Sequence, residues 1–378
     1  MENIEQIIQL VGHNEVITQS FLKTKQILNM FDRPLCSISG GKDSDIMLDM
    51  ITKLDTDKKV RYVFFDTGIE YSATRKHLDY LEEKYGIIID REKAIKPIPV
   101  TCIEYGQPFL SKLVSGHIES LQKRGFQFED DSYDELSKRY TECSSALRWW
   151  TNKNMNEKFN ISYNTYLKEY LINNPPSFAI SDRCCQYAKK DPSHKYEAEH
   201  NCDLRITGIR RSEGGVRAAA YKDCFTDNTG TGNMSAYRPL FWYTQDDEKE
   251  YDKIFGLRHS DCYEVYGYTR TGCAGCPFDK DVLENQKIAE KYEPNFAKAA
   301  SKIFADSYAY TERYKEYLVR KQKVYREARK VAKSAFDIWC WQQDGYDVIK
   351  PLCNYKRTIY NAIRKEFVDK RIAELLAG

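Results

Sequence analysis

Six consecutive residues, 39–44 (Ser-Gly-Gly-Lys-Asp-Ser), combine two glycines with a lysine, an aspartate and two serines. They follow a mostly apolar stretch, 35–38, and precede an apolar-periodic one, 45–54, so the pattern predicts strand, tight loop and helix. Backbone N–H groups in such a loop and at the helix N-terminus converge on one spot and favour an anion. Glycines allow close backbone approach, and lysine adds a positive charge. We therefore predict a phosphate site built from Ser39, Gly40, Gly41, Lys42, Asp43 and Ser44.

The loop lacks the Gly-x-x-x-x-Gly-Lys-Ser/Thr pattern of the common NTPases. It resembles the Ser-Gly-Gly-x-Asp-Ser loop of the ATP pyrophosphatases (adenine nucleotide alpha hydrolases), which include the phosphoadenosine phosphosulfate (PAPS) reductase family. The alternative is a glycine turn with an exposed lysine. The resemblance implies ATP, adenylyl sulfate (APS) or PAPS as ligand, with its α-phosphate over Gly40 and Gly41. It makes Lys42 and Asp43 catalytic candidates, with Asp43 either fixing the loop or holding Mg²⁺.

A second short apolar run, 60–65, ends at Asp66-Thr67-Gly68, with Glu70 close behind. Ligands bind at the carboxyl ends of strands in an open parallel sheet, so Asp66 should lie on the same rim as the glycine loop. This motif resembles the family's second nucleotide motif, near the adenosine and ribose; the alternative is a helix cap. We also expect a helix capped by Ser72 and a third strand at 87–89. Residues 106–112 resemble a third family motif, which places Lys112 towards the phosphates.

A cluster of arginines follows a short strand that we expect to end at Gly208. Arginine forks suit phosphate or sulfate oxygens. The run resembles the family's Gly-x-Arg-x-x-Glu-Ser/Gly-x-x-Arg pattern, which implies nucleotide binding by Arg210, Glu213 and Arg217, with catalytic charge neutralisation by the two arginines. Glu213 would hold an arginine in place, and Arg211 ranks second. The alternative is a solvated charge cluster.

Four of the twelve cysteines form two pairs, Cys184-Cys185 and Cys273-x-x-Cys276. A Cys-x-x-Cys turn lets two thiolates reach one metal, and its amides bond to the sulfurs. Tetrahedral zinc sites generally use two spaced pairs of cysteines, and an adjacent pair fits such a site poorly. The ligand positions of a multi-iron cluster lie farther apart, so adjacent cysteines can bind different irons. The adenylylsulfate reductases and the cluster enzymes of DNA phosphorothioation, in the same family, carry similar pairs on a [4Fe–4S] cluster. We predict such a cluster on Cys184, Cys185, Cys273 and Cys276, with zinc or no metal as alternatives.

Composition favours a soluble globule: hydrophobic residues make up 42% of 378, and no apolar run approaches the ~20 residues of a membrane span. The polar N-terminus does not resemble a signal peptide, so we expect a cytoplasmic protein with reduced thiols. From Lys287 onward 20 Lys and Arg face 12 Asp and Glu, which suggests a polyanion partner or a solvated helical face.

The predicted fold is α/β, a Rossmann-like, mainly parallel sheet (adenine nucleotide alpha hydrolase-like) with helical additions at both ends. We assign an N-terminal helical segment to 1–30, broken at Asn14, and the nucleotide-binding domain with its cysteines to 31–278. A basic helical region, 279–378, follows. Its basic residues interleave with tyrosines, a pattern that suits either ordinary helix packing by the tyrosines or binding of single-stranded nucleic acid.

The chain departs from the family in one respect. Sulfonucleotide reductases use a C-terminal cysteine in Glu-Cys-Gly-Leu-His, and no such motif occurs here. The first hypothesis is therefore cleavage of ATP at the α-phosphate, adenylation of an acceptor such as nucleic acid, and sulfur transfer from a donor such as a cysteine desulfurase. The second is APS or PAPS reduction to sulfite with a thioredoxin-like reductant, using Cys262, Cys340 or Cys353. The third is a non-catalytic protein that binds nucleotide and cluster.

Overall fold

The computed structural model describes residues 4–214, 220–229 and 234–342, with a few positions between 365 and 374. Contacts between residues divide the chain into two compact units. The sheet unit comprises Met1–Tyr163 and Pro176–Ala309. The helical unit comprises Asn164–Pro175 and Tyr310–Gly378.

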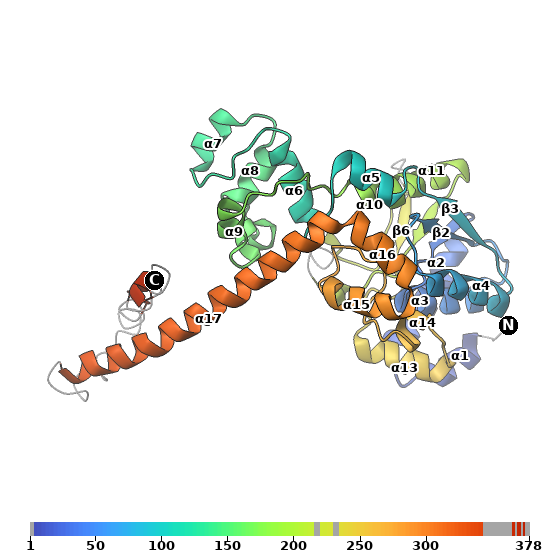
Figure 1. The fold of residues 1–378 in the computed structure, drawn as a ribbon. Coiled ribbons are helices and arrows are strands. Elements are labelled where there is room, and N and C mark those ends of the chain that lie inside the picture. Colours follow the sequence, from blue (N-terminus) through green and yellow to red (C-terminus); the bar gives the residue numbers. More distant parts are fainter. Residues whose placement is uncertain are drawn as a thin grey trace. The chain divides into compact units, whose positions relative to one another are not determined.

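The sheet unit is built on six strands in the order β3-β2-β1-β4-β6-β5, parallel except for β5 (Figure 1). Their bounds are β1 Pro34–Ser37, β2 Arg61–Asp66, β3 Ile89–Lys93, β4 Leu204–Ile206, β5 Phe225–Thr226 and β6 Ser235–Tyr237. β1 lies between β2 and β4, so the loops that follow these three strands share one edge of the sheet. The predicted α/β fold with a mainly parallel sheet is confirmed.

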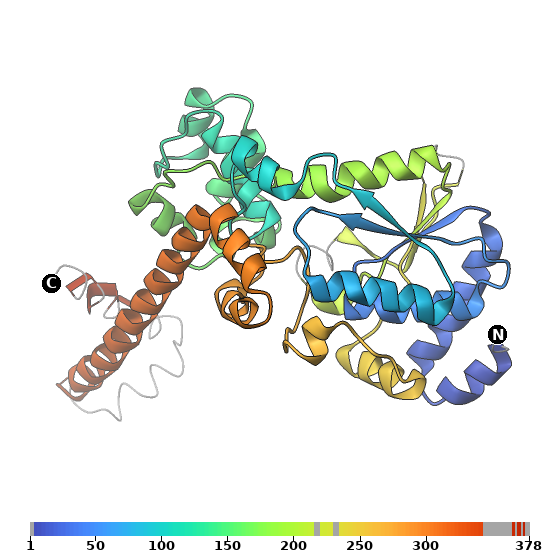
Figure 2. The same ribbon diagram turned by 45° about the vertical axis from the view of Figure 1, so that its right-hand side comes forward.

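Helices cover both faces of this sheet (Figure 2). The larger core joins the strands to α1 Ile4–Val11, α2 Glu15–Met30, α3 Lys42–Leu54, α4 Ser72–Tyr85 and α13 Gln245–Phe255. On the other face Tyr196 of α11, Asp191–Glu199, packs against Leu35 and Val63. Asn14 breaks the N-terminal helix as predicted, because its side chain accepts the Ile17 N–H and caps α2. Burial of the central strands on both faces explains their continuous apolar runs.

The remaining helices of the sheet unit lie between and after these strands. They are α5 Ile98–Tyr105, α6 Lys112–Gln122, α7 Tyr133–Arg139, α8 Ser144–Trp150, α10 Arg183–Cys185, α14 Asp261–Glu264, α15 Val282–Tyr292 and α16 Pro294–Ile303. A π-helical turn, Gln186–Lys190, joins α10 to α11.

Three predicted boundaries are wrong. The third strand was expected at 87–89 but begins at Ile89, because β3 is an edge strand whose half-exposed residues carry no apolar run; Ile88 is 78% exposed. The strand expected to end at Gly208 ends at Ile206. Ser72 is the first residue of α4 rather than its cap. The buried Glu293 carboxylate caps this helix from a distance, accepting the N–H groups of Ser72 and Ala73.

In the helical unit, α9 Leu167–Asn173 packs against the tyrosines of α17 Ala305–Gln342. Tyr170 contacts the rings of Tyr310, Tyr314 and Tyr317. These three tyrosines of α17 are spaced three or four residues apart and therefore lie on one face of the helix. That face packs against α9 within the protein. The helical character predicted for the region 279–378 is confirmed over 282–342, where α15, α16 and α17 lie. Within the described ranges, no helix has the length and apolar character needed to cross a membrane.

Candidate functional site

The glycine loop connects β1 to α3 as the sequence predicts. Gly40 adopts a left-handed conformation (φ +69°), and a Cβ there would lie 2.8 Å from Thr74 Cγ2, so glycine is required on both counts. Gly41 caps α3, and the Ser44 hydroxyl accepts its N–H at 3.1 Å and donates to its carbonyl at 2.8 Å. The loop therefore enters α3 with the helix N-terminus directed at the edge of the sheet, a geometry that favours an anion.

Arg210 reaches this loop from the segment after β4. Its Nε lies 3.1 Å from Asp43 Oδ1 and 2.6 Å from Glu248 Oε1 on α13. Burial and the Asp43 carboxylate raise the pKa of Glu248 to about 9, since the two carboxyl groups face each other across one arginine. At neutral pH Glu248 is therefore protonated, and the half-buried Arg210 guanidinium lies beside the loop. The sequence predicted Asp43 and Arg210 but not Glu248.

The other predicted nucleotide ligands are distributed along the same edge and beyond it. Asp66 closes its own turn by accepting the Gly68 N–H and lies 3.3 Å from the Arg75 guanidinium. Lys112 begins α6, where its charge partly opposes the Cys184 thiol and burial, which raise the pKa of Cys185. Glu213 lies exposed on a short 3₁₀ turn after Arg210. Arg217 lies outside the described residues.

The two cysteine pairs meet in a second cluster. Cys184 and Cys185 are buried (3% and 8% exposed), and the half-buried Cys273 packs against them. Electrostatic interactions link Cys276 with Cys273 and Cys185, and Cys184 with Cys276. Burial, followed by these neighbouring thiols, raises the pKa of Cys276. The Cys102 thiol raises the pKa of Cys184, which places a fifth cysteine beside the set; the sequence gave no signal for it.

A lysine supplies positive charge to these thiols. The Cys273 thiol raises the pKa of Lys189 against the opposing effect of burial, and Glu70 and Cys185 act in the same direction as Cys273. Burial raises the pKa of Glu70, which accepts a 2.6 Å hydrogen bond from Thr67. Lys189 follows Cys185 by four residues, so helical spacing places the two on one side of the chain. This spacing was the signal that could have revealed Lys189.

Four coupled thiols beside a lysine suit a group that binds thiolates, because the cation offsets their negative charge. Gly275 (φ +64°) provides the turn between Cys273 and Cys276, whose N–H donates to the Cys273 carbonyl. Among the residues that the structure describes, no three His, Cys, Asp or Glu side chains are close enough to hold a single metal ion. Thiols beside a lysine are chemically suited to an iron–sulfur cluster, and the cluster remains a prediction.

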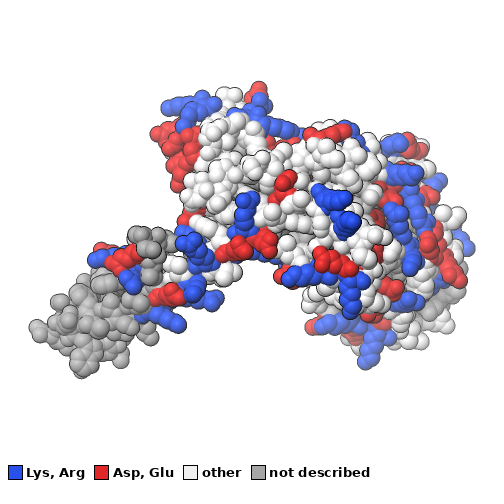
Figure 3. All heavy atoms as spheres, in the orientation of Figure 1, with Lys and Arg blue, Asp and Glu red and all other residues white. Residues whose placement is uncertain are grey.

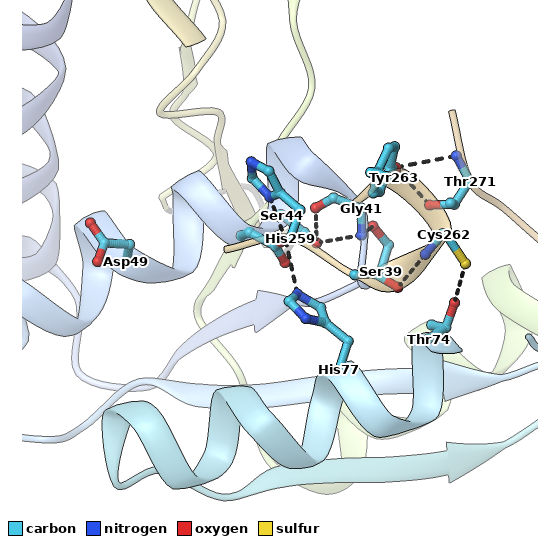
Figure 4. A network of polar contacts seen from close by, with 12 residues as sticks. Ser39, Gly41, Ser44, Asp49, Thr74, His77, His259, Cys262, Tyr263 and Thr271 are labelled. Atoms are coloured by element: carbon cyan, nitrogen blue, oxygen red, sulfur yellow. Dashed lines mark hydrogen bonds and ion pairs between the residues drawn. The ribbon is translucent and has the colours of Figure 1, made fainter. Parts of the chain in front are cut away.

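Two further features border the glycine loop (Figure 4). Tyr263 and Thr271 join their hydroxyl groups at 2.7 Å beside Gly41. Beneath the loop, Asp45 Oδ2 lies 2.9 Å from His77 Nε2 and 2.8 Å from His259 Nδ1. These residues come from distant segments and form no contiguous motif, so the sequence did not indicate them.

The spare cysteine candidate, Cys262, is fully buried, with Sγ 3.8 Å from Thr74 Oγ1. Burial raises its pKa to about 11. Cys340 and Cys353 lie outside the residues whose side chains the structure describes.

Residues 33–107 and 124–278 match the model of the phosphoadenosine phosphosulfate reductase domain. The chain belongs to this family. The match covers both the glycine loop and the two cysteine pairs, and it interrupts only at 108–123. Members of the family are enzymes of the adenine nucleotide alpha hydrolase class.

Two relatives of this PAPS reductase-family protein carry the description 'uncharacterized'. A 37.8 kDa protein of Escherichia phage 186 is 24% identical over 250 residues, 64% of this chain and 66% of that protein. A protein of Methanocaldococcus jannaschii is 28% identical over 182 residues, 45% of this chain and 35% of that protein. This chain therefore spans less than two thirds of either relative.

Similar solved structures include the PAPS reductase of Candida auris in a phosphate complex (14% identity, 66% of this chain and 87% of that chain, TM-score 0.37). The match to the NH3-dependent NAD synthetase of Campylobacter jejuni covers 82% of this chain and 96% of that chain, at 11% identity and TM-score 0.33. The U34-tRNA thiolase NcsA of Methanococcus maripaludis, solved with its [4Fe–4S] cluster, covers 80% and 79%, at 15% identity and TM-score 0.33.

Proposed function

We propose that this PAPS reductase-family protein binds ATP or another adenylyl nucleotide at residues 39–44, cleaves it at the α-phosphate and transfers sulfur to the activated acceptor. Residues 31–278 would form the nucleotide- and cysteine-bearing domain. Lys42, Asp43, Arg210 and Arg217 are the proposed catalytic residues, and Asp66, Lys112 and Glu213 complete the nucleotide site. Cys184, Cys185, Cys273 and Cys276 are the proposed ligands of a [4Fe–4S] cluster.

One observation carries this proposal: the nucleotide loop and the cysteine pairs meet at the same edge of the sheet. The Ala274 N–H donates to the Ile69 carbonyl at 3.1 Å, which ties the Cys-x-x-Cys turn to the segment after β2. Thr271, two residues before Cys273, lies against Gly41 of the glycine loop. A nucleotide activated at the loop would therefore lie beside the thiols rather than on another face.

The chemistry follows from the charges of the chain. An acceptor oxygen would attack the α-phosphorus, the bond to the bridging oxygen would break, and pyrophosphate would leave with its charge neutralised by Lys42 and Arg210. A pre-positioned donor of this kind contributes ~3 kcal/mol to the barrier reduction. A Mg²⁺ ion held by phosphate oxygens would use Asp43 as its carboxylate. Cys184, Cys185, Cys273 and Cys276 would hold the cluster, which would supply a binding site for sulfur at the sulfide level. Sulfide derived from a persulfide donor such as a cysteine desulfurase, with two electrons from a thioredoxin-like dithiol, would attack the acceptor atom that bears the adenylated oxygen; the bond to that oxygen would break, and AMP would leave.

Nucleic acid is one acceptor that the basic α17 would suit. Arg313, Arg320, Lys323 and Arg326 are exposed on it, but Glu312 and Glu316 lie among them. On the face shown in Figure 3, acidic and basic side chains are interspersed rather than separated. The test should therefore offer RNA, DNA and small oxygen acceptors alike.

The experiment begins with anaerobic purification, a visible spectrum and analysis of iron, sulfide and zinc. About four irons and four sulfides per chain, reduced in Cys184→Ser and Cys276→Ser, support the cluster; one zinc and no colour contradict it. Pyrophosphate release from ATP is then measured with each acceptor. Lys42→Ala should lower the rate about 100-fold or more, whereas Lys76→Ala, an exposed lysine on α4, should not.

Two outcomes would overturn the proposal. The first is a cluster-loaded protein that neither binds ATP nor releases pyrophosphate with any acceptor. The second is release of sulfite from APS or PAPS with thioredoxin, which would establish sulfonucleotide reduction instead.

A further inference from the structure

Two hydroxyl groups lie beside Gly41 of the glycine loop (Figure 4). A Cβ placed on Gly41 would lie 3.2 Å from Tyr263 Oη and 3.5 Å from Thr271 Oγ1. The Lys42 ammonium lies 5.0 Å from the centre of the Tyr263 ring. Both hydroxyl groups are therefore within contact distance of the backbone that would receive a phosphate.

Counting donors shows what this pair can offer. The hydroxyl groups share one hydrogen bond of 2.7 Å, and Tyr263 Oη also accepts the Thr271 N–H at 3.2 Å. Two O–H groups with one bond between them leave one O–H donor, whichever residue donates in that bond. Within the described ranges, neither hydroxyl has another acceptor, and both lie against Gly41 of the loop.

A charged acceptor is the partner that this arrangement would favour. Hydrogen bonds to ionised oxygens are shorter and stronger than neutral ones, and the loop N–H groups and Lys42 already attract negative charge. An uncharged ligand would gain little from the ammonium beside the ring. The remaining hydroxyl thus points to a phosphate oxygen rather than to a sugar or base.

We propose that Tyr263 and Thr271 are phosphate ligands, which supply one shared hydroxyl donor to the nucleotide phosphate seated on the Ser39–Ser44 loop. This inference rests on the proposed function and adds two ligands from a segment far from the loop in sequence. Because Thr271 precedes Cys273 by two residues, the same contact would fix the Cys-x-x-Cys turn relative to the nucleotide.

The donor count makes a sharp prediction for a double-mutant cycle. Either Tyr263→Phe or Thr271→Val leaves one hydroxyl free to donate, so each should weaken binding of pyrophosphate and of α,β-methylene-ATP two-fold or less, measured by calorimetry on the full chain. The double variant removes the donor and should weaken both about ten-fold or more. Tyr263→Phe/Thr271→Ser restores a hydroxyl and should bind like the single variants.

Tyr266→Phe is the matched control, because it removes a hydroxyl from the same segment whose partner is Glu293. It should leave affinity unchanged. Wild-type protein that binds neither probe overturns the proposed function itself. Two results overturn only the role of this pair. In one, the wild type binds the probes and the double variant binds them equally well. In the other, the affinity losses of the two single variants multiply to give the loss of the double variant.

Discussion

A buried histidine beneath the nucleotide loop should make the stability of this protein depend on pH. His259 lies between two carboxylates, with Nδ1 2.8 Å from Asp45 Oδ2 and Nε2 3.0 Å from Asp252 Oδ2. Its side chain is 3% exposed. Burial lowers the pKa of His259, but hydrogen bonds to Asp252 and Asp45 more than offset this effect and raise the pKa to about 9.

The magnitude follows from the difference between the folded and unfolded states. The unfolded pKa is about 6.5, so a folded value of about 9 corresponds to ~3 kcal/mol of stabilisation. Because the folded pKa is the higher one, this contribution is fully present below pH 6.5 and is lost as pH rises through 9. Removing the imidazole leaves the buried Asp45 carboxylate and the half-buried Asp252 carboxylate without this cation, so the variant should lose about the same ~3 kcal/mol below pH 6.5.

The assay is denaturant unfolding of the wild type and His259→Gln at intervals from pH 6.5 to 9.5. The difference in unfolding free energy should be largest at pH 6.5 and should narrow by ~3 kcal/mol towards pH 9.5. His13→Gln is the control, because His13 forms an ion pair with Glu250 while 60% exposed; its difference should be under about 1 kcal/mol and nearly flat. A difference for His259→Gln that stays constant or widens with pH would refute the assigned protonation.

Three further changes test the site. Lys189→Met should lower the affinity of the cysteines for iron about 10–100-fold, measured by iron retained against a chelator; full retention would contradict its role. Glu248→Gln should leave nucleotide affinity within about two-fold at pH 7, because burial and Asp43 already keep this carboxyl protonated with a pKa of about 9. Above pH 9 the nucleotide affinity of the wild type should fall, whereas that of Glu248→Gln should not. If the affinities of the two proteins change in parallel with pH, this reasoning is contradicted. Gly275→Ala should lower the free energy of unfolding by more than the ~1–2 kcal/mol that a left-handed backbone costs, because the added Cβ would lie only 2.6 Å from Tyr308 Oη. The same substitution should reduce the iron content of the protein. Gly267→Ala, with φ +76° and open space, isolates the backbone cost, and equal losses would exclude the clash.

The glycine loop and the cysteine pairs could be predicted because each is a short contiguous motif whose residues need only local geometry. Ser39 to Ser44 required a strand before them and a helix after them, and apolar periodicity supplied both. The edge strand β3 could not be placed in the same way, because the apolar residues at 87–88 precede it and its own side chains alternate between half-buried and exposed. An edge strand that pairs on one side only can carry charged residues at alternate positions, and such a sequence is easily taken for a loop.

The contacts that complete the site could not be predicted, because they join segments that only the tertiary fold brings together. Glu248 lies in the acidic first turn of α13, where carboxylates favour the helix dipole and carry no chemical signal. Its role is visible only once Arg210 and Asp43 are beside it. The same holds for Glu293, which caps α4 from the start of α16. Long-range caps and shared ion pairs leave no periodic trace in a sequence.

The geometry also separates the two enzymatic hypotheses at Cys262. A sulfonucleotide reductase needs a thiol that ionises and reaches the sulfur of its substrate. Cys262 is fully buried, and burial raises its pKa to about 11, so less than about one thiol in a thousand would be ionised at neutral pH. One residue further along, the Tyr263 hydroxyl faces Gly41 instead. This segment therefore presents a hydroxyl rather than a nucleophilic thiol to the loop, which counts against Cys262 as the thiol of a sulfonucleotide reductase.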